Sequence, residues 1–168
     1  MALADLSPPM TLDELDDYGM VRMTDEEVTG YLASQRVGVL GLPTEHAPSL
    51  RPMSFGFDGD SRLYLLYVLG EQSRKAELSA AAEHARVLVY SAETPFNWRS
   101  VLLTGRLSEV PEEDVERAEA ALTDAWRPDV FERASQAEAT RLYRFDIEER
   151  TGLKHLGLPP GFEDQRAE

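Results

Sequence analysis

The segment that most constrains the fold of this chain is PSLRPMSFGFDGDSRLYLLYVLG, residues 48–70. Two runs rich in aromatic and branched residues flank Asp58-Gly59, a pair that strongly favours a tight turn between antiparallel strands. Four further apolar runs, at 37–43, 86–92, 98–110 and 140–149, predict additional strands. Six strands joined mainly by hairpins favour a mainly β fold, an antiparallel barrel, over a doubly wound parallel sheet.

Short helices are predicted between these strands. The segment 23–35 begins with a capping box formed by Thr24 and Glu27, and a hydrophobic staple pairs Met23 with Val28. A second helix is predicted at 73–84, and a third follows Pro111, where apolar residues recur at helical spacing (Val115, Ala118, Leu122, Trp126). We therefore expect an acidic arm at 1–22, one barrel domain at 23–150, and a Gly/Pro-rich tail at 151–168 that packs on the barrel or on a dimer partner.

Charge and composition exclude several classes of function. The formal net charge of −14 repels nucleic acid and anionic membranes, and no apolar run approaches the length of a membrane span. The chain has no cysteine, three histidines and no pattern of metal ligands, so we expect no metal site. The amino-terminal residues lack the pattern of a secretory signal, so we expect a cytoplasmic protein.

Fifteen of the seventeen cationic residues are arginine, and the two lysines are Lys75 and Lys154. An acidic chain with so little lysine indicates adaptation to a high-salt cytoplasm, where screening removes the repulsion between carboxylates. A preference of the genome for arginine codons would explain the missing lysine but not the acidity.

The predicted helix at 73–84 begins with Ser73, Arg74 and Lys75. Two cations in the first turn oppose the helix dipole by roughly 0.3–1 kcal/mol each, and a bound dianion would reverse that sign. Backbone N–H groups, a serine hydroxyl and two cations together suit a phosphate. The alternative is that both side chains pair with surface carboxylates such as Glu71 or Glu77.

The strand RPMSFGF (51–57) alternates large and small side chains. Arg51, Met53, Phe55 and Phe57 are predicted on one face, and Pro52, Ser54 and Gly56 on the other. The small residues leave room for a flat ring to lie close to the backbone. Taken alone, this strand favours the alternative explanation of the glycine, a bulge or a tight corner of the barrel.

In order along the chain, RPMSFGF, LYLLYVLGEQSRKAEL and WRSVLLTGRLSEV resemble the pyridoxamine 5′-phosphate oxidase-like family of FMN-binding split β-barrels, over residues 24–150. The resemblance implies a six-stranded antiparallel split barrel and a homodimer with FMN at the subunit interface. It places Arg51, Pro52, Met53 and Ser54 along the flavin ring, Tyr67 and Val68 beside it, and Ser73, Arg74 and Lys75 on the phosphate. Ser100 occupies the place of a family glutamine, and Trp98 lies two residues earlier on the same face.

Two departures separate the chain from the true oxidases. One extra residue lies between Tyr67 and Ser73, and the carboxy-terminal Arg-x-His segment that recognises pyridoxal is absent. We therefore expect no vitamin B6 oxidation. Lys154 and His155 either lie on a surface tail or fold over one edge of the flavin, where a cation would stabilise the reduced ring.

The resulting prediction is an FMN-dependent oxidoreductase that transfers hydride or electrons to or from a small molecule, with no catalytic acid or base assigned. The alternatives are a deazaflavin-dependent reductase of the same fold, and a protein that binds flavin or haem without turnover. A deazaflavin cofactor carries a longer anionic tail than FMN, so its binding groove would be expected to have more cations than this sequence shows. Haem would require an axial ligand from His155 or His46.

Overall fold

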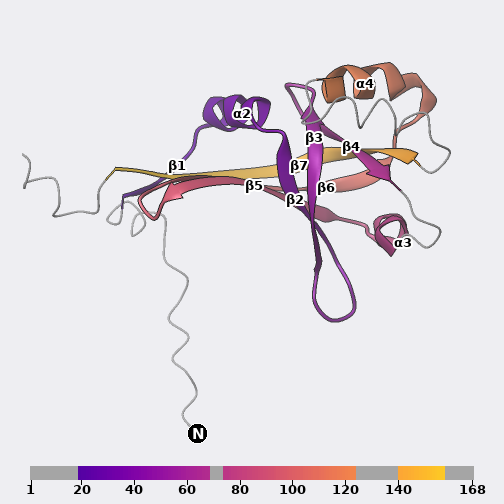
Figure 1. The fold of residues 1–168 in the computed structure, drawn as a ribbon, viewed down its shortest axis with the longest axis horizontal. Coiled ribbons are helices and arrows are strands. Elements are labelled where there is room, and N and C mark those ends of the chain that lie inside the picture. Colours follow the sequence, from indigo (N-terminus) through magenta and orange to yellow (C-terminus); the bar gives the residue numbers. More distant parts are fainter. Residues whose placement is uncertain (1–18, 69–73, 124–139, 158–168) are drawn as a thin grey trace, which may run out of the picture.

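The computed structural model describes residues 19–68, 74–123 and 140–157. In chain order the elements are β1 (Met20–Arg22), α2 (Asp25–Ser34), β2 (Val37–Leu42), β3 (Ser49–Phe57), β4 (Arg62–Val68), α3 (Arg74–Ala81), β5 (Ala85–Thr94), β6 (Asn97–Glu109), the 3₁₀ turn η1 (Glu112–Asp114), α4 (Val115–Thr123) and β7 (Thr140–Leu156) (Figure 1). The strands are ordered β1-β7-β4-β3-β2-β5-β6, and β7 also pairs with β6. This second pairing closes six antiparallel strands into a barrel, which confirms the predicted fold class.

Strand β7 closes the barrel because it is long enough to pair with both β4 and β6. It is also much longer than predicted. Its residues 140–146 pair with β4 along one edge, while 143–156 pair with β6 along the other. Residues 153–155 also pair with β1, which lies inside the segment predicted to be an arm. Strand β7 therefore continues past the predicted boundary between barrel and tail at residue 150, and residues 151–156 pair with β6.

Gly152 shows why the strand continues where the sequence indicated a break. A Cβ atom at this position would lie 2.7 Å from Val28 Cγ2 and 2.8 Å from Met23 Cβ. The glycine allows the predicted staple residues at the start of α2 to pack directly on β7. The capping box of α2 is also confirmed, because Glu27 N donates to Thr24 Oγ1 and Thr24 N donates to a Glu27 carboxylate oxygen.

The connection between β3 and β4 spans residues 58–61, so it is longer than the tight turn predicted at Asp58-Gly59. Asp58 Oδ1 accepts hydrogen bonds from the backbone N–H groups of Asp60, Ser61 and Arg62. Gly59 has φ +87°, a conformation that suits glycine. One carboxylate therefore organises the whole turn.

Helix α4 covers the end of the β3–β4 hairpin. A Cβ atom on Gly56 would lie 2.2 Å from the carbonyl oxygen of Ala121 in α4. The prediction that Gly56 leaves room for a flat ring is therefore wrong, since the backbone of α4 fills that space. Met53, Phe55 and Phe57 share one face of β3, as predicted, and this face points inward: Phe55 is fully buried, and Met53 and Phe57 pack against the core.

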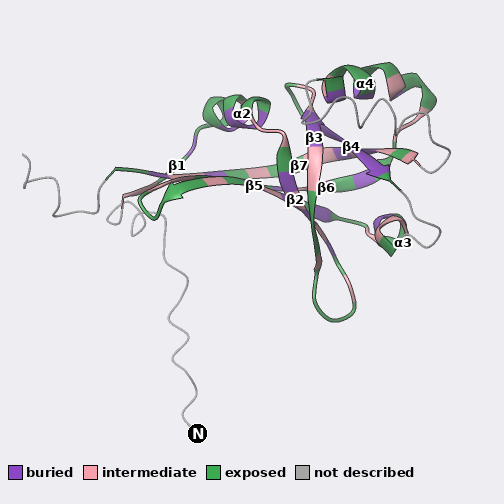
Figure 2. Cartoon of the chain, viewed as in Figure 1, coloured by how far each residue is buried: buried purple, intermediate pink, exposed green. Residues whose placement is uncertain are grey.

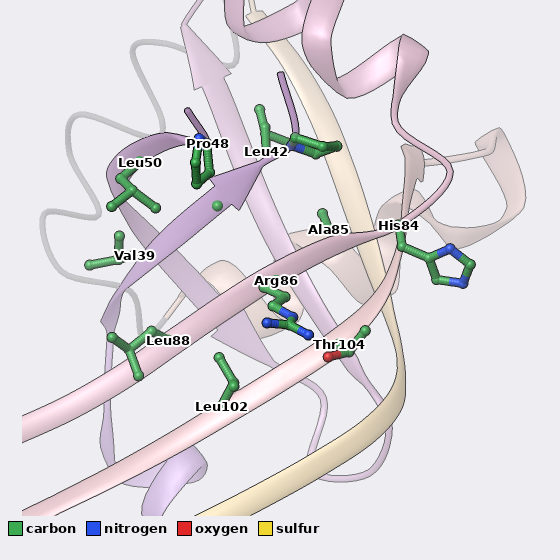
Figure 3. Close-up of a pocket in the computed structure, with 12 residues that line it drawn as sticks. Val39, Leu42, Pro48, Leu50, His84, Ala85, Arg86, Leu88, Leu102 and Thr104 are labelled. Carbon is green, nitrogen blue, oxygen red and sulfur yellow. The ribbon is translucent and has the colours of Figure 1, made fainter. Parts of the chain in front are cut away.

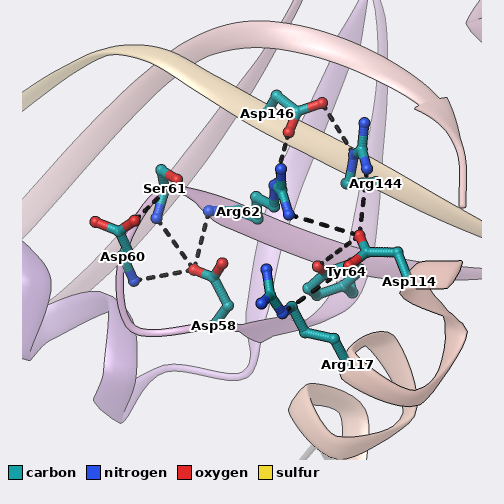
Figure 4. A network of polar contacts seen from close by, with 9 residues as sticks. All are labelled: Asp58, Asp60, Ser61, Arg62, Tyr64, Asp114, Arg117, Arg144 and Asp146. Atoms are coloured by element: carbon teal, nitrogen blue, oxygen red, sulfur yellow. Dashed lines mark hydrogen bonds and ion pairs between the residues drawn. The ribbon is translucent and has the colours of Figure 1, made fainter.

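A polar network attaches the start of α4 to the barrel (Figure 4). The buried carboxylate of Asp114 accepts hydrogen bonds from Tyr64 Oη at 2.9 Å and Arg144 Nη1 at 3.3 Å. Asp146 in turn accepts from Arg62 Nε and Arg144 Nε, both at 3.0 Å. Burial acts to raise the pKa of Asp114, but these hydrogen bonds and the charge of Arg62 outweigh it and lower the pKa below its ordinary value.

We expect Asp114→Asn to lower the free energy of unfolding by about 2 kcal/mol at pH 7, because it leaves Arg62 and Arg144 with only one of the two carboxylates that they share, Asp146. A carboxylate with a depressed folded-state pKa stabilises the fold above its ordinary pKa of 3.8, and this contribution is lost as pH falls through the folded value. The difference between variant and wild type should therefore shrink in acid. Urea unfolding at pH 7 and near pH 3 measures it, with Asp60→Asn in the exposed turn as control; a difference independent of pH would contradict the assignment.

The buried side chains form a main core inside the barrel and a smaller cluster, Tyr64, Ala118 and Leu122, beneath α4. Figure 2 shows burial concentrated where β3 and β4 meet α4, with the β5–β6 hairpin and the connection between β2 and β3 largely exposed. None of the described helices has the length and apolar character that a membrane span requires.

The net charge of −14 leads to a prediction about salt. Since 31 acidic residues face 17 cations, repulsion between carboxylates should dominate at low ionic strength. We expect the melting temperature to rise steadily from tens of millimolar to molar potassium chloride. Thermal melts across this series test the prediction, and a melting temperature that stays flat or falls would contradict adaptation to salt.

Candidate functional site

The barrel opens between β3 and β4. These strands pair only at Phe55–Phe57 with Leu63–Leu65, although β3 begins at Ser49 and β4 continues to Val68. Residues 49–54 pair with β2 on their other edge, and residues 66–68 pair with β7 on theirs. In the described part of the chain, no strand pairs with the two edges that face each other. We call this opening, between residues 49–54 and 66–68, the β3–β4 split.

Lys75 reaches from α3 to both strands that border the split. Its Nζ lies 3.8 Å from Met53 Sδ on β3 and 4.3 Å from the centre of the Tyr67 ring on β4. The ammonium group therefore lies over the face of an aromatic ring, a favourable position for a cation. Burial lowers the pKa of Lys75, and the positive charge of nearby Arg51 lowers it further.

Tyr67 fixes the position of α3 beside the split. Its buried hydroxyl lies 2.9 Å from Ser79 Oγ, and Ser79 donates to the backbone carbonyl of Lys75 at 2.7 Å. The ring stacks on Tyr143 of β7, with the centroids 4.1 Å apart. Burial raises the pKa of Tyr67 to about 12, so this hydroxyl stays protonated and serves as a hydrogen-bonding anchor.

In the described part of the chain, no acidic side chain pairs with the cations around the split. Among the described residues, Arg51, Arg74 and Lys75 make no ion pair with a carboxylate, and Glu77 does not pair with Arg74. Ser73 and Glu71 lie outside the described residues. In a chain with 31 acidic residues, an uncompensated group of cations beside two open strand edges fits an anionic ligand that also forms hydrogen bonds with backbone groups.

The structure brings together most of the first group of predicted site residues. Arg51, Pro52, Met53 and Ser54 line the split from β3, Tyr67 and Val68 line it from β4, and Arg74 and Lys75 begin α3. Val68 is exposed, whereas Tyr67 is fully buried beneath Lys75. Ser79 and Tyr143 were not predicted, although the alternation of inward side chains along β7 could have identified Tyr143.

The second group of predicted residues lies elsewhere in the same chain. Tyr67 is paired with Arg141 of β7, while Ser100 is paired with Leu153, twelve residues further along that strand. This separation corresponds to roughly 40 Å of strand length. Figure 1 accordingly shows α3 and the tip of the β5–β6 hairpin at opposite ends of the molecule. One copy of the chain does not bring Trp98 and Ser100 to its own split.

Lys154 and His155 have structural contacts. Lys154 forms an ion pair with Glu27, a member of the capping box, and this hydrogen bond lowers the pKa of Glu27. His155 is 5% exposed, with Nδ1 2.7 Å from the carbonyl oxygen of Phe96. Its ring lies near that of Trp98, with centroids 6.3 Å apart, and a Cβ atom on Gly19 would be 3.0 Å from its Nε2. These contacts fix the end of β7 and orient Trp98.

Comparison with known proteins identifies the relatives of this chain. A family model described as pyridoxamine 5′-phosphate oxidase matches residues 24–154. No curated protein is a significant match. Among solved structures, a FAD-binding protein from Mesorhizobium loti aligns with a TM-score of 0.66 at 22% identity, covering 82% of this chain and 98% of that chain.

Two mycobacterial structures are similar in the same way. A FAD-binding protein from Mycobacterium smegmatis has a TM-score of 0.62 at 17% identity, covering 82% of this chain and 100% of its own. A FAD- and haem-binding protein from the same organism has a TM-score of 0.66 at 19% identity, covering 89% of this chain and 79% of its own. At these identities the likeness shows a shared fold.

Proposed function

The chain belongs to the pyridoxamine 5′-phosphate oxidase family, and on this premise we propose that it is a flavoprotein oxidoreductase that binds FMN in the β3–β4 split. The observation that carries the proposal is the half-buried ammonium of Lys75, held between Met53 and Tyr67 beside a second cation and two open strand edges. A phosphate would neutralise the two charges, and the backbone edges would offer donors and acceptors to the polar side of a ring.

In this proposal each residue of the split has a defined task. Lys75, Arg51 and Arg74 bind the phosphate together with Ser73, and the backbone of 51–54 borders the ring. The Ser79–Tyr67 contact keeps Lys75 in place, and the stacked Tyr67 and Tyr143 form a rigid floor beneath it. When bound, FMN would supply the transfer of hydride or electrons to or from a small molecule. The protein contributes position and charge.

We further propose that the site is completed by a second copy of the chain. Trp98 and Ser100 line a hollow of about 260 Å³ on the outer face of the β5–β6 hairpin, together with Tyr90 and Arg99. Large apolar side chains are exposed on this side of the barrel, among them Val37, Tyr90 and Leu102. In a homodimer this face of one copy would cover the split of the other. Its few polar groups among apolar side chains match the composition of stable interfaces.

A mixing experiment tests the shared site. A copy carrying Arg51→Met and Lys75→Met lacks the phosphate cations, and a copy carrying Trp98→Ala lacks the proposed cover. Each variant alone should bind FMN weakly, but a dimer formed from both should contain one intact site, because both defects fall in the other site. We expect about half of the mixed dimers' sites to bind FMN with wild-type affinity. Absence of recovery in dimers verified by light scattering would contradict a site shared between copies.

The identity of the cofactor is tested on the protein as purified from molar salt. We expect the visible absorption spectrum of an oxidised flavin, and the released cofactor to be FMN by mass. The apo protein should then bind FMN in titrations that follow flavin fluorescence. Release of FAD, of a deazaflavin or of haem would mean that the released molecule is the cofactor and FMN is not. Failure to bind any flavin would overturn the proposed function.

A further inference from the structure

The two lysines of the chain, Lys75 and Lys154, differ in what surrounds their amines. Lys154 forms an ion pair with Glu27. Lys75 Nζ instead lies 3.8 Å from Met53 Sδ and 4.3 Å from the centre of the Tyr67 ring, and it pairs with no carboxylate of the described residues. Its neighbours are thus a thioether and an aromatic face, which are weak acceptors for an ammonium proton.

This environment makes Lys75 a better nucleophile than an ordinary surface lysine. Burial lowers the pKa of Lys75, and the positive charge of Arg51 lowers it further. At a given pH a larger fraction of the side chain is then the neutral amine, which is the form that attacks a carbonyl carbon. Desolvation and a neighbouring cation are the conditions that activate lysines for this chemistry, and Lys75 has both.

The cations beside Lys75 favour one class of partner for this amine. Arg51 lies on β3 and Arg74 begins α3, and neither pairs with a carboxylate in the described part of the chain. A phosphate would be attracted to these two guanidinium groups. If the same molecule carries an aldehyde, binding of its phosphate brings the carbonyl carbon near the amine and raises its effective concentration there.

We propose that Lys75 is a site of covalent modification, at which a small phosphorylated aldehyde condenses with the amine when the β3–β4 split holds no cofactor. The nitrogen lone pair forms a bond with the carbonyl carbon, and the carbonyl oxygen leaves as water with two protons from the nitrogen. The product is an imine, and no oxidant or reductant is consumed. The phosphate of the adduct would occupy the cations of the split and so exclude FMN, although the condensation itself does not require that FMN be the cofactor.

An aldehyde bound elsewhere on the chain would not give the same product. A hollow of about 510 Å³, formed by β2, β5 and β6 with the connection between β2 and β3, offers Arg86 to an anion but contains no lysine (Figure 3). Lys154 lies beside the carboxylate of Glu27, which repels an anionic aldehyde. The position of the adduct therefore distinguishes recognition at the split from general reactivity of amines.

Two matched aldehydes test the proposal on the full-length apo protein. Glyceraldehyde 3-phosphate carries the required phosphate, and glyceraldehyde lacks it. Cyanoborohydride reduces each imine to a stable amine, and peptide mapping by mass spectrometry gives the rates at Lys75, at Lys154 and at the amino terminus separately. We expect the phosphorylated aldehyde to modify Lys75 roughly tenfold or more faster than glyceraldehyde does, because only the first can pair with the arginines. Lys154 should react slowly and without this preference. Equal rates at the two lysines, or equal rates with the two aldehydes at Lys75, would overturn the proposal.

Variants separate the nucleophile from the cations. Lys75→Arg keeps the charge but removes the amine, so the adduct should disappear while Lys154 reacts as before. Arg51→Met should lower the preference of Lys75 for the phosphorylated aldehyde, and Arg117→Met, an exposed arginine on α4, should leave it unchanged. Thermal melts verify that each variant is folded. A preference that survives Arg51→Met undiminished would overturn the role of Arg51.

An excess of FMN separates this proposal from the proposed function. If FMN binds in the split, it should protect Lys75 from the aldehyde and leave the rate at Lys154 unchanged. Flavin that binds by fluorescence titration without protecting Lys75 would place the flavin elsewhere, while the selective modification of Lys75 would stand. A protein that binds FMN but whose apo form is not modified at Lys75 would overturn the present inference alone.

Discussion

Replacing Arg51 and Lys75 together with methionine is expected to weaken FMN binding at least about a hundredfold while leaving the apo protein as stable as the wild type, or more stable. Each charge-assisted contact with a phosphate contributes about 1.5–3 kcal/mol, and two such contacts together give this loss. Stability should not fall, because the pKa of Lys75 is lowered by burial and by repulsion from Arg51. Methionine keeps the contact with Tyr67 and Met53 and removes the repulsion.

Titration of FMN into the apo variant measures the loss, and thermal melts of the two apo proteins measure stability. Arg22→Met combined with Arg117→Met removes two exposed arginines away from the split and from its proposed cover, so this double variant controls for the change in net charge. Equal losses of affinity in both double variants would indicate a general effect of charge. An affinity unchanged by Arg51→Met and Lys75→Met would place the phosphate elsewhere.

The second large effect is expected from Gly56→Val. The new Cβ atom would lie 2.2 Å from Ala121 O and 2.4 Å from Ala121 C, which are backbone atoms of α4 and cannot rotate away. Helix α4 must move off the barrel, which also strains the buried Tyr64–Asp114 hydrogen bond. We expect the free energy of unfolding to fall by about 3 kcal/mol or more, roughly 6–12 °C in melting temperature.

Gly30→Ala is the matched control for this prediction. No atom lies within 4 Å of a Cβ added at Gly30, which is inside α2. Alanine there should stabilise the helix by up to about 1 kcal/mol. Thermal and urea unfolding of both variants give the comparison. A Gly56→Val protein as stable as wild type would show that α4 is not held against β3.

The sequence was sufficient to predict the architecture of the barrel because alternation and turn chemistry are local signals. The capping box at Thr24 and the hairpin around Asp58 depend on residues within a few positions of each other, and both were predicted. The requirement for glycine at positions 56 and 152 comes from long-range packing, since each glycine makes room for a helix that is distant in the sequence. A glycine in isolation does not indicate whether a ligand, a turn or another backbone lies against it.

The candidate site shows the same division. The cations at Arg74 and Lys75 could be predicted because two cations in the first turn oppose the helix dipole, whereas Arg51 was assigned to the site by the resemblance to the family. The pairing of Lys154 with Glu27 could not, because it joins β7 to the start of α2 across the fold. Trp98 and Ser100 lie on β6 beside the far end of β7, and this position likewise depends on strand register, which composition and spacing do not determine.

The most direct test of the central claim is a crystal structure of the full-length protein with FMN bound at high salt. The account predicts the phosphate within hydrogen-bonding distance of Lys75 Nζ and the Arg51 guanidinium group, with the ring along residues 51–54. It also predicts that Trp98 of a second copy covers that ring. A flavin bound away from the β3–β4 split would contradict the account.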